Sequence, residues 1–467
     1  MQLFPYQEQA VSFLNNQRRA YLALDMGMGK TLTSLAAADR GGGNVLLVAE
    51  KNEIVNSQNF KREVETYLPH FTYYNLREES PLDGAGGSGD GAAVGGINPD
   101  GLVKLDDKLL SIFRTMIIDE ATLAKTTTTQ RFKRIHKIAK DMDYLSMLSG
   151  TPMMNGAAEL YAPLLLMDHP MIAGKGASGR KAFEAIFAGG HYRKIRNTGK
   201  WFQDYTWWAK GANHVRELRY LLRDHFFILS KGETDVFKHK TRTVENVPMS
   251  LPWLGEYTQA WNDYYDEAKT RSVNLDNINE LRSLIENGQM YQVNCRWLAK
   301  RMAQDIADGR YGKRRIIAFN IFIEADEVFQ QELTRLGVSF RTFEDIQEWK
   351  AGDEQVLVGR MKAHGKGGNA PEASVTLIAG MDYVPANNIQ AENRMDRPEQ
   401  TQDMEVVYYL TEGDDVIDTH VRDINKDKAR KVAEFMRPLT DEELEDMPRK
   451  LAAIRLKYRK DAALLGI

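Results

Sequence analysis

Residues 20–37 read AYLALDMGMGKTLTSLAA, an apolar run of strand length followed by a glycine-rich turn and a helical pattern. Glycine lets backbone N–H groups close around phosphate oxygens, and the N-terminus of the following helix adds its positive end. In such a turn Lys30 would reach the β and γ phosphates of a nucleotide, and the Thr31 hydroxyl would bind Mg²⁺. The stretch therefore predicts a nucleotide phosphate site formed by Gly27, Gly29, Lys30 and Thr31, with a chance Gly-Lys-Thr turn as the weaker alternative.

Short apolar runs recur on both sides of this turn and alternate with longer amphipathic stretches. This alternation is typical of a parallel sheet with crossover helices, in an α/β fold. We expect strands in two groups, one early and one late in the chain, which predicts two α/β lobes. The expected strands are 20–24, 45–49, 116–118 and 144–148, and then 315–319, 355–358, 375–379 and 405–410.

The chain between and after these lobes reads differently. Residues 157–312 contain helical patterns such as 251–268 and 277–302 and few strand-like runs, which predicts a mainly helical insertion between the lobes. The expected division is a first lobe at 1–156, the insertion at 157–312, a second lobe at 313–438 and a C-terminal helical tail at 439–467. Within the first lobe, the glycine-rich residues 84–101 are expected to form a flexible surface loop. The tail is expected to pack on the second lobe.

Composition limits the class of protein. The 467 residues carry 62 Lys+Arg against 65 Asp+Glu, and 43% of them are hydrophobic, as in an ordinary globular protein of two or three domains. A net charge of −3 gives no global argument for a nucleic-acid partner, so such a partner must be argued from local patches. The single cysteine, Cys295, excludes an intrachain disulfide framework. We expect a cytosolic protein without a membrane span, and composition does not indicate its host.

Two adjacent carboxylates follow the expected strand at 116–118. Asp119 would hold Mg²⁺, directly or through its waters, and Glu120 would polarise the water that attacks a γ-phosphate. Such a pair alone is a weak signal, but in the same lobe as the phosphate loop it predicts a nucleotide hydrolase. A third polar group, Ser149-Gly-Thr-Pro152, follows the strand at 144–148, with Asn155 close behind. By residue type it is a turn, and it could relay the state of the γ-phosphate.

A fourth motif lies in the second lobe, in residues 388–400, NIQAENRMDRPEQ. Arg394 and Arg397 are three residues apart, so on a helix they would share one face and point at a single site. A salt-bridged surface helix is the alternative, because acidic residues lie nearby. Together with the other motifs, the two arginines are predicted to act as arginine fingers in catalysis.

These four motifs, in this order, resemble superfamily 2 helicases and translocases, and specifically the Swi/Snf-like branch. The matching stretches are 25–31, 119–122, 149–155 and 390–400, and weaker matches fill the gaps between them over about residues 1–415. The resemblance implies two RecA-like lobes and the cofactors ATP and Mg²⁺. It implies that Gln7 reads adenine, that Thr31 and Asp119 hold the metal, and that Lys30, Asp119, Glu120, Gln390, Arg394 and Arg397 are catalytic.

The sequence departs from the family pattern at three places. Thr122 replaces the usual histidine of the second motif, and 227–231 stands where the family tends to have paired arginines. The motif at 365–370 has Gly-Gly-Asn-Ala where Gly-Leu-Asn-Leu would be expected. The compact second lobe resembles small viral or mobile-element members of the family.

Nucleic-acid contacts are expected from the family's motifs and from two basic patches, around 179–200 and 291–320. Basic side chains can neutralise phosphates and neighbouring aromatic rings can stack on bases, although a solvated helix face is an equally good interpretation of each patch. Trp207 and Trp208 are expected to pack in the core. The candidate contacts are Lys51, Asn98, Lys125, Arg193, Lys194, Arg196, Gly368 and Asn369.

The resemblance implies an enzyme, a DNA-dependent ATPase that moves along duplex or branched DNA and works in phage replication or recombination. One alternative is a single-strand or RNA helicase of the same superfamily. Another is a nucleotide-gated DNA-binding module that hydrolyses ATP slowly, which the departures at Thr122 and 365–370 leave open.

Overall fold

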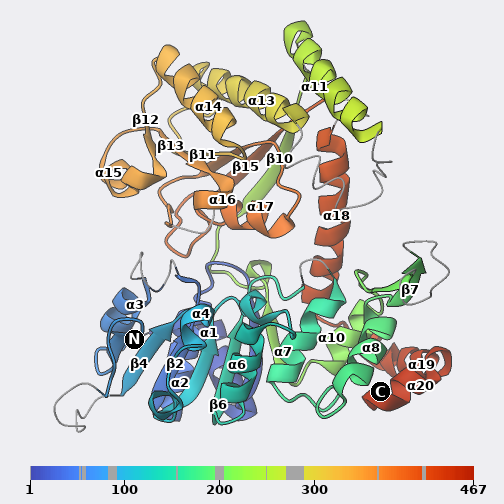
Figure 1. Cartoon of the computed structure of the whole chain (residues 1–467). Helices are drawn as coiled ribbons and strands as arrows, with labels where there is room; N and C mark the ends of the chain where they lie inside the picture. Colours follow the sequence, from blue (N-terminus) through green and yellow to red (C-terminus); the bar gives the residue numbers. More distant parts are fainter. Residues whose placement is uncertain are drawn as a thin grey trace. The chain divides into compact units, whose positions relative to one another are not determined.

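The chain forms two compact units, each with its own parallel sheet (Figure 1). Residues 1–234 and 430–467 make the first unit, and residues 235–429 make the second. The computed structural model describes residues 2–51, 54, 59–82, 92–153, 156–194, 205–248, 250–269, 289–364, 368–412 and 417–467.

Seven described strands form the sheet of the first unit, in the order β3-β4-β2-β5-β6-β1-β9, and every neighbouring pair is parallel. The early strands expected from the sequence are therefore confirmed. The strands are β1 (Arg19–Leu24), β2 (Asn44–Val48), β3 (Thr72–Asn75), β4 (Ala93–Ile97), β5 (Phe113–Ile118), β6 (Tyr144–Leu148) and β9 (Phe226–Leu229).

The helices of the first unit cover both faces of this sheet. They are α1 (Pro5–Gln17), α2 (Lys30–Gly41), α3 (Asn59–Tyr67), α4 (Pro99–Leu102), α5 (Asp107–Leu110), α6 (Gln130–Ala139), α7 (Tyr161–Leu166), α8 (Gly176–Phe187), α10 (Val215–Leu221), α19 (Asp441–Lys457) and α20 (Arg459–Leu465), with 3₁₀ turns η2 (Ala121–Ala124), η3 (Ala157–Leu160) and η4 (Lys231–Glu233). Among the described residues of the whole chain, no helix is long and apolar enough to cross a bilayer.

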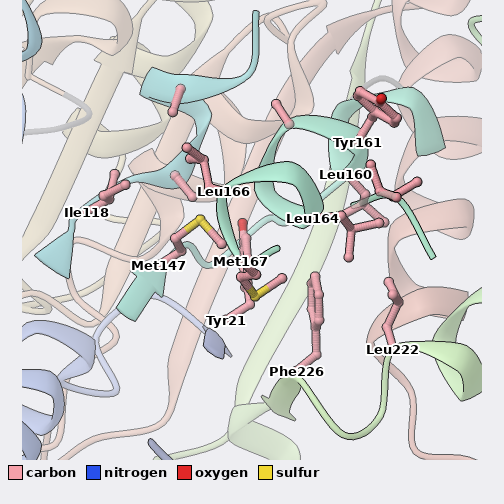
Figure 2. Close-up of a cluster of buried hydrophobic side chains, with 14 of the residues drawn as sticks. Tyr21, Ile118, Met147, Leu160, Tyr161, Leu164, Leu166, Met167, Leu222 and Phe226 are labelled. Carbon is pink, nitrogen blue, oxygen red and sulfur yellow. The ribbon is translucent and has the colours of Figure 1, made fainter. Parts of the chain in front are cut away.

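Alternate strand residues point into a core shared with the helices on one face of the sheet. Tyr21, Ile118 and Met147 meet side chains from η3, α7 and the segment leading to β9 (Figure 2). The rings of Tyr21 and Phe226 stack with centroids 4.6 Å apart. Intervening residues such as Leu22 are also fully buried. Because both faces are covered, the strands read as continuous apolar runs, which explains why the sequence reveals them.

The expected surface loop at 84–101 is wrong for its second half. Residues 83–91 lie outside the described part, but Ala93–Ile97 is β4, a fully buried strand between β3 and β2. Its glycines serve close packing, because a Cβ at Gly95 would lie 2.7 Å from the side chains of Leu76 and Phe113, and one at Gly96 would collide with the Tyr73 hydroxyl. Glycine in a strand can mark such close approach as well as a loop.

Six described strands form the sheet of the second unit, in the order β10-β15-β14-β11-β13-β12, again all parallel, so the late strands are confirmed. They are β10 (Lys240–Val247), β11 (Ile316–Asn320), β12 (Phe340–Thr342), β13 (Val356–Arg360), β14 (Val375–Ala379) and β15 (Met404–Thr411). The helices are α11 (Leu251–Lys269), α13 (Gln289–Ala307), α14 (Ile323–Arg335), α15 (Ile346–Ala351), α16 (Met361–His364), α17 (Pro385–Glu392) and α18 (Ile417–Met436), with the 3₁₀ turn η5 (Phe343–Asp345).

The expected insertion at 157–312 is not one structural region. Its first half belongs to the first unit, because β9 adds to the sheet beside β1. Its second half belongs to the second unit, where β10 pairs with β15 over eight residues and α11 and α13 join the core. The strand β10 was missed because it is an edge strand with mostly exposed, polar side chains, KTRTVENV. Part of the expected helix at 277–302 lies outside the described residues.

The C-terminal tail packs on the first unit, contrary to the expectation that it packs on the second. Helix α18 leads out of the second unit at residue 429, and Met447, Leu451 and Ile454 of α19 join the core of the first unit. Arg216 of α10 holds the C-terminal tail against the rest of the first unit. Its buried guanidinium donates to Glu443 (2.6 and 2.8 Å) and to the backbone carbonyls of residues 434, 437 and 438.

Arg216→Ala is expected to lower the free energy of unfolding of the first unit by about 3 kcal/mol at pH 7, because it leaves Glu443 and three carbonyls without their buried donor.

The effect should depend on pH, because the Arg216 hydrogen bond lowers the pKa of Glu443 to about 2. A depressed carboxyl pKa gives stability above pH ~4.5 that is lost as pH falls through the folded-state value, so the difference between wild type and variant should narrow below pH ~4.5. Urea unfolding at several pH values measures both effects. Arg437→Ala, which removes an exposed partner of the same carboxylate, should cost less than about 1 kcal/mol.

Candidate nucleotide site

The predicted phosphate loop connects the C-terminal end of β1 to the N-terminus of α2. Its backbone takes the left-handed region at Gly27 (φ +86°) and Gly29 (φ +73°), conformations that favour glycine. Helix α2 begins at Lys30, so the positive end of the helix faces the loop. Gly27, Gly29, Lys30 and Thr31 are therefore brought together as a loop and helix start of the kind that binds phosphate.

Gln7 braces this loop from α1. Its Nε2 donates to the Met28 carbonyl (3.1 Å), and its Oε1 accepts from the Phe4 backbone N–H (2.9 Å). The Tyr6 hydroxyl donates to the same Met28 carbonyl (3.1 Å), a contact that the sequence did not suggest. Gln7 is buried, so its amide fixes the loop in this structure, and its expected role in reading adenine stays a prediction.

Gly29→Ala is expected to lower ATP affinity at least about tenfold, or ~1.4 kcal/mol. A Cβ at Gly29 would lie 2.6 Å from Gln7 Nε2, which is pinned by its own hydrogen bonds, and the positive φ adds backbone strain. Titration with a fluorescent ATP analogue measures the change.

The matched control is Gly42→Ala, at the other end of α2. Gly42 has nearly the same φ (+75°), but nothing lies within 4 Å of its added Cβ. Gly42→Ala therefore introduces the same backbone strain as Gly29→Ala but no steric clash. The ATP affinity of the Gly42→Ala protein should stay within about twofold of wild type. Equal losses in the two variants would contradict a specific role for the contact between Gly29 and Gln7.

Lys30 folds over the end of β1. Its Nζ donates to the carbonyls of Leu24 (3.0 Å) and Asp25 (3.2 Å). A Cβ at Gly150 would lie 3.4 Å from the same Nζ, so the turn after β6 passes directly beside the lysine. The phosphate loop and the Ser149-Gly150 turn are thus adjacent.

The two carboxylates follow β5 as predicted. The Asp119 backbone N–H donates to the Val48 carbonyl (2.8 Å), which fixes the end of the strand. Glu120 has φ +56°, a strained value for a residue with a side chain, and such strain is concentrated at functional sites. The Ser149 hydroxyl donates to Glu120 Oε1 (3.0 Å) and accepts from the Thr151 N–H (3.1 Å). A short hydrogen-bonded chain therefore joins the two motifs, and its expected role in relaying the state of the γ-phosphate stays a prediction.

The donor set fits a nucleotide with Mg²⁺. Thr31 supplies a half-buried hydroxyl at the start of α2, and Asp119 supplies a carboxylate at the end of β5. Hard oxygen ligands of this kind are what Mg²⁺ prefers, with water and phosphate oxygens completing its shell. Asn155 lies outside the described residues.

The arginine motif of the second unit differs from its expected geometry. Helix α17 ends at Glu392, so Arg394 and Arg397 lie in the turns that follow and do not share a helical face. Arg394 is buried, and its Nε donates to the Gln390 carbonyl (3.3 Å), while Arg397 is half-buried. The helix cannot continue through Arg397 because Pro398 follows it and disfavours helical backbone at the preceding residue.

Two acidic residues of this motif, Glu392 and Asp396, are buried and do not lie on a solvated surface, whereas Glu399 is exposed. Lys240 of β10 binds Asp396 (2.8 Å) and Glu392 (3.6 Å), and Arg242 binds Glu392 (2.7 Å). The Tyr408 hydroxyl donates to Glu392 as well (2.7 Å). This network around the buried carboxylates ties the arginine segment to the sheet. The sequence did not reveal it because its cations lie in the unrecognised strand β10.

The candidate nucleic-acid residues fall in three places. In the first unit, Lys51 (exposed), Asn98 and Lys125 follow the C-terminal ends of β2, β4 and β5, at the same edge of the sheet as the phosphate loop. Asn98 is buried, directly precedes α4, and its side-chain oxygen accepts a hydrogen bond from Arg77 (3.2 Å). Lys125 lies 3.8 Å from a Glu159 oxygen.

The second unit holds Gly368 and Asn369, both exposed, and the neighbouring Ala370 N–H donates to the Arg394 carbonyl (2.9 Å).

The remaining candidates lie on an antiparallel hairpin of the first unit, β7 (His191–Lys194) and β8 (Tyr205–Trp208), where Arg193 and Lys194 are exposed. Arg196 lies outside the described residues. Trp207 and Trp208, expected in the core, are only half-buried because the hairpin stands at the edge of the unit (Figure 1).

One contact that sequence reasoning missed joins the loop to the edge of the sheet. The Lys231 backbone N–H donates to an oxygen of Asp25 (2.9 Å), because β9 lies beside β1. Residues 227–231 had been noted only as a departure from the family pattern. The apolar run FFIL at 226–229, which overlaps them, was the local signal that a strand lies here.

Comparisons with known proteins agree with these motifs. A family model described as "Type III restriction enzyme, res subunit" matches residues 1–153. The "SWI/SNF-related matrix-associated actin-dependent regulator of chromatin subfamily A-like protein 1" of Xenopus tropicalis is 29% identical over 232 residues, 48% of this chain and 22% of that protein. Its homolog of Caenorhabditis elegans is 24% identical over 440 residues, 89% of this chain and 60% of that protein.

The chain thus spans less than two thirds of the length of these curated relatives. A solved structure described as "Sulfolobus solfataricus SWI2/SNF2 ATPase core in complex with dsDNA" matches 97% of this chain and 96% of its own, with 18% identity and a TM-score of 0.40.

Proposed function

We propose that this chain, as a relative of the Swi/Snf-like branch of helicase superfamily 2, is a DNA-dependent ATPase that uses ATP hydrolysis to move along duplex or branched DNA. One observation carries the proposal. The ends of the adjacent strands β1, β5 and β6 bring Lys30, Glu120 and Ser149 to one edge of the first sheet. Ligand sites of parallel α/β sheets lie at this edge.

The proposed chemistry follows from these side chains. Lys30 neutralises charge on the terminal phosphates, and Glu120 orients and polarises the attacking water. Ser149 holds the Glu120 carboxylate through the 3.0 Å hydrogen bond. When bound at Thr31 and Asp119, Mg²⁺ supplies further charge neutralisation at the phosphate oxygens. Arg394 and Arg397 of the second unit are proposed to stabilise the transition state, with Gln390 supporting them.

For the nucleic acid, we propose that Lys51, Asn98 and Lys125 in the first unit and Gly368 and Asn369 in the second contribute to a backbone track. Contacts to phosphates give affinity without sequence preference, which suits a motor. The single cysteine, Cys295, is buried and forms no disulfide within the chain. A free thiol is typical of a reducing cytosol, such as that of a bacterium or a phage-infected host. Phage replication or recombination is the proposed setting.

ATP turnover measured alone and then with linear duplex, forked DNA, single-stranded DNA and RNA tests the proposal. We expect stimulation by every DNA that contains duplex, and no turnover from a Lys30→Ala control. Stimulation by RNA alone would overturn DNA as the substrate. Turnover that no nucleic acid stimulates would favour a slow nucleotide-gated binding module.

A further inference from the structure

The β7–β8 hairpin of the first unit has two different faces. Its register pairs His191 with Trp208, Tyr192 with Trp207, Arg193 with Thr206 and Lys194 with Tyr205. Because neighbouring strand residues point to opposite sides, Tyr192 and Trp207 share one face with Lys194 and Tyr205. His191, Arg193, Thr206 and Trp208 share the other, which we call the outer face.

The first of these faces has a structural role. The Trp207 Nε1–H donates to Glu184 of α8 (2.6 Å), and the Lys181 ammonium donates to the Tyr192 hydroxyl (2.9 Å). At the base, the Gly190 N–H donates to the Glu184 carbonyl (2.7 Å). These contacts attach the hairpin to α8 and account for Trp207.

Among the residues that the structure describes, no side chain from a helix packs on the outer face as Glu184 and Lys181 do on the other. Arg193 lies 5.1 Å and Lys210 lies 4.4 Å from the centre of the Trp208 ring. All residues of the outer face except Trp208 are exposed, and so is Lys210. Within the part of the chain that the structure describes, neither Arg193 nor Lys210 pairs with a carboxylate. The outer face thus presents a half-buried indole beside two exposed basic side chains.

A tryptophan of the second unit also has two basic side chains over its ring, but there the basic side chains are ion-paired. Trp253 has Arg296 and Lys300 over its ring (5.6 and 5.3 Å). There, however, Arg296 pairs with Glu256 (3.3 Å) and Lys300 pairs with Glu332 (3.6 Å). The ring of Trp253 also packs on Trp297, with centroids 5.9 Å apart. That cluster is neutralised and packed, whereas within the described ranges the cations of the outer face have no carboxylate partner and Trp208 stacks on no other aromatic ring.

We propose that the outer face of the hairpin binds an unpaired segment of a DNA strand, with Trp208 stacking on a base and Arg193 and Lys210 holding the flanking phosphates. An indole flanked by cations is complementary to a base flanked by phosphates. Exposed cation–π contacts are weaker than base stacking, so both long side chains can turn from the ring to the phosphates. Bases within a duplex have their faces covered by neighbours, so only an unpaired base offers a face to Trp208.

The hairpin is connected to the nucleotide site through its outgoing end. The Ala157 N–H donates to the Gly211 carbonyl (3.0 Å), directly after Lys210. A Cβ at Gly156 would lie 2.7 Å from that carbonyl, so the two segments approach closely. Gly156 follows the Ser149–Thr151 turn by only a few residues. A strand held by Lys210 on the outer face therefore lies next to Gly211, which is hydrogen-bonded to Ala157, a residue that follows the Ser149–Thr151 turn in the chain.

The inference rests on the proposed function, because it names the branched substrates that such a motor would recognise. Its test is binding without ATP, by fluorescence anisotropy of the full chain with a labelled single-stranded oligothymidine and with a blunt duplex. Trp208→Ala should weaken single-strand binding about tenfold and change duplex binding less than about twofold. Trp208→Phe, which keeps a ring, should retain most of the affinity.

Charge is tested separately. Arg193→Ala with Lys210→Ala should reduce the salt dependence of single-strand binding by about 1.4 in the slope of log K against log salt, since each phosphate contact contributes ~0.7. Thr206→Ala on the same face and Trp253→Ala in the neutralised cluster should bind like wild type. Thermal unfolding checks that each variant is folded.

Three results would overturn the inference: unchanged single-strand binding in Trp208→Ala, equal losses for single strand and duplex, or an equal loss in Trp253→Ala. Duplex-stimulated ATP turnover of wild type and Trp208→Ala separates the two proposals. Stimulation of both by blunt duplex supports the motor whatever the hairpin binds. If no DNA stimulated the ATP turnover of the wild-type protein, the proposed motor function would be wrong. The binding measurement would still decide whether Trp208 binds single-stranded DNA.

Discussion

Glu120→Gln should bind ATP with nearly wild-type affinity and hydrolyse it at least about 100-fold more slowly, because general-base assistance of this kind contributes on the order of 10² to 10⁴ in rate. The amide keeps the size of the side chain and can still accept the Ser149 hydrogen bond through its oxygen. It cannot polarise a water as a carboxylate does. The substitution therefore separates hydrolysis from binding.

Two measurements check this result, ATP affinity by nucleotide titration and single-turnover hydrolysis with saturating duplex DNA. Glu8→Gln is the matched control, because Glu8 is an exposed carboxylate of the same unit that pairs with Arg40. It should hydrolyse ATP at the wild-type rate. A Glu120→Gln protein with normal turnover would remove the role assigned to Glu120. An equal loss of ATP binding would instead make Glu120 a residue that shapes the loop, as its positive φ could also suggest.

The arrangement of the candidate nucleotide site was predictable because each of its parts is local in sequence. A buried parallel strand reads as an apolar run, and the polar residues just after it must lie at the edge of the sheet where ligands bind. Lys30, Glu120 and Ser149 could therefore be assigned before their contacts were known. This prediction did not require knowing that β5, β6 and β1 are neighbours. In a parallel sheet the C-terminal ends of all strands meet at the same edge, whatever the order of the strands.

Features that depend on distant partners could not be predicted. Arg216 and Glu443 are 227 positions apart, and nothing local marks either of them. The edge strand β10 has polar, exposed side chains, so the apolar signal that revealed the other strands is missing there. Gly95 and Gly96 suggested a loop because the side chains that need their space, among them Tyr73, come from a neighbouring strand. Pro398, in contrast, was a local signal that Arg397 does not lie in a helix, and sequence reasoning overlooked it.

Arg397→Ala should lower ATP turnover by on the order of 10³ to 10⁵ while ATP affinity stays nearly unchanged, as expected for an arginine that acts on the transition state. ATP is proposed to bind through residues of the first unit, and Arg397 belongs to the second. Its half-buried side chain lies in a turn that the Gln400 N–H closes by donating to the Arg397 carbonyl (3.0 Å). Truncating the side chain leaves this backbone contact in place, so the second unit should stay folded.

Arg394 should behave differently, because it is buried and bonded to the Gln390 carbonyl. Arg394→Ala is expected to lower turnover and also the thermal stability of the second unit, whereas Arg397→Ala lowers turnover alone. Arg335→Ala, which removes an exposed arginine paired with Glu332 in the same unit, is the control and should change neither. If Arg397→Ala destabilised the unit as Arg394→Ala does, or weakened ATP binding in proportion to turnover, Arg397 would be a structural residue and the catalytic charge would have to come from Arg394 alone.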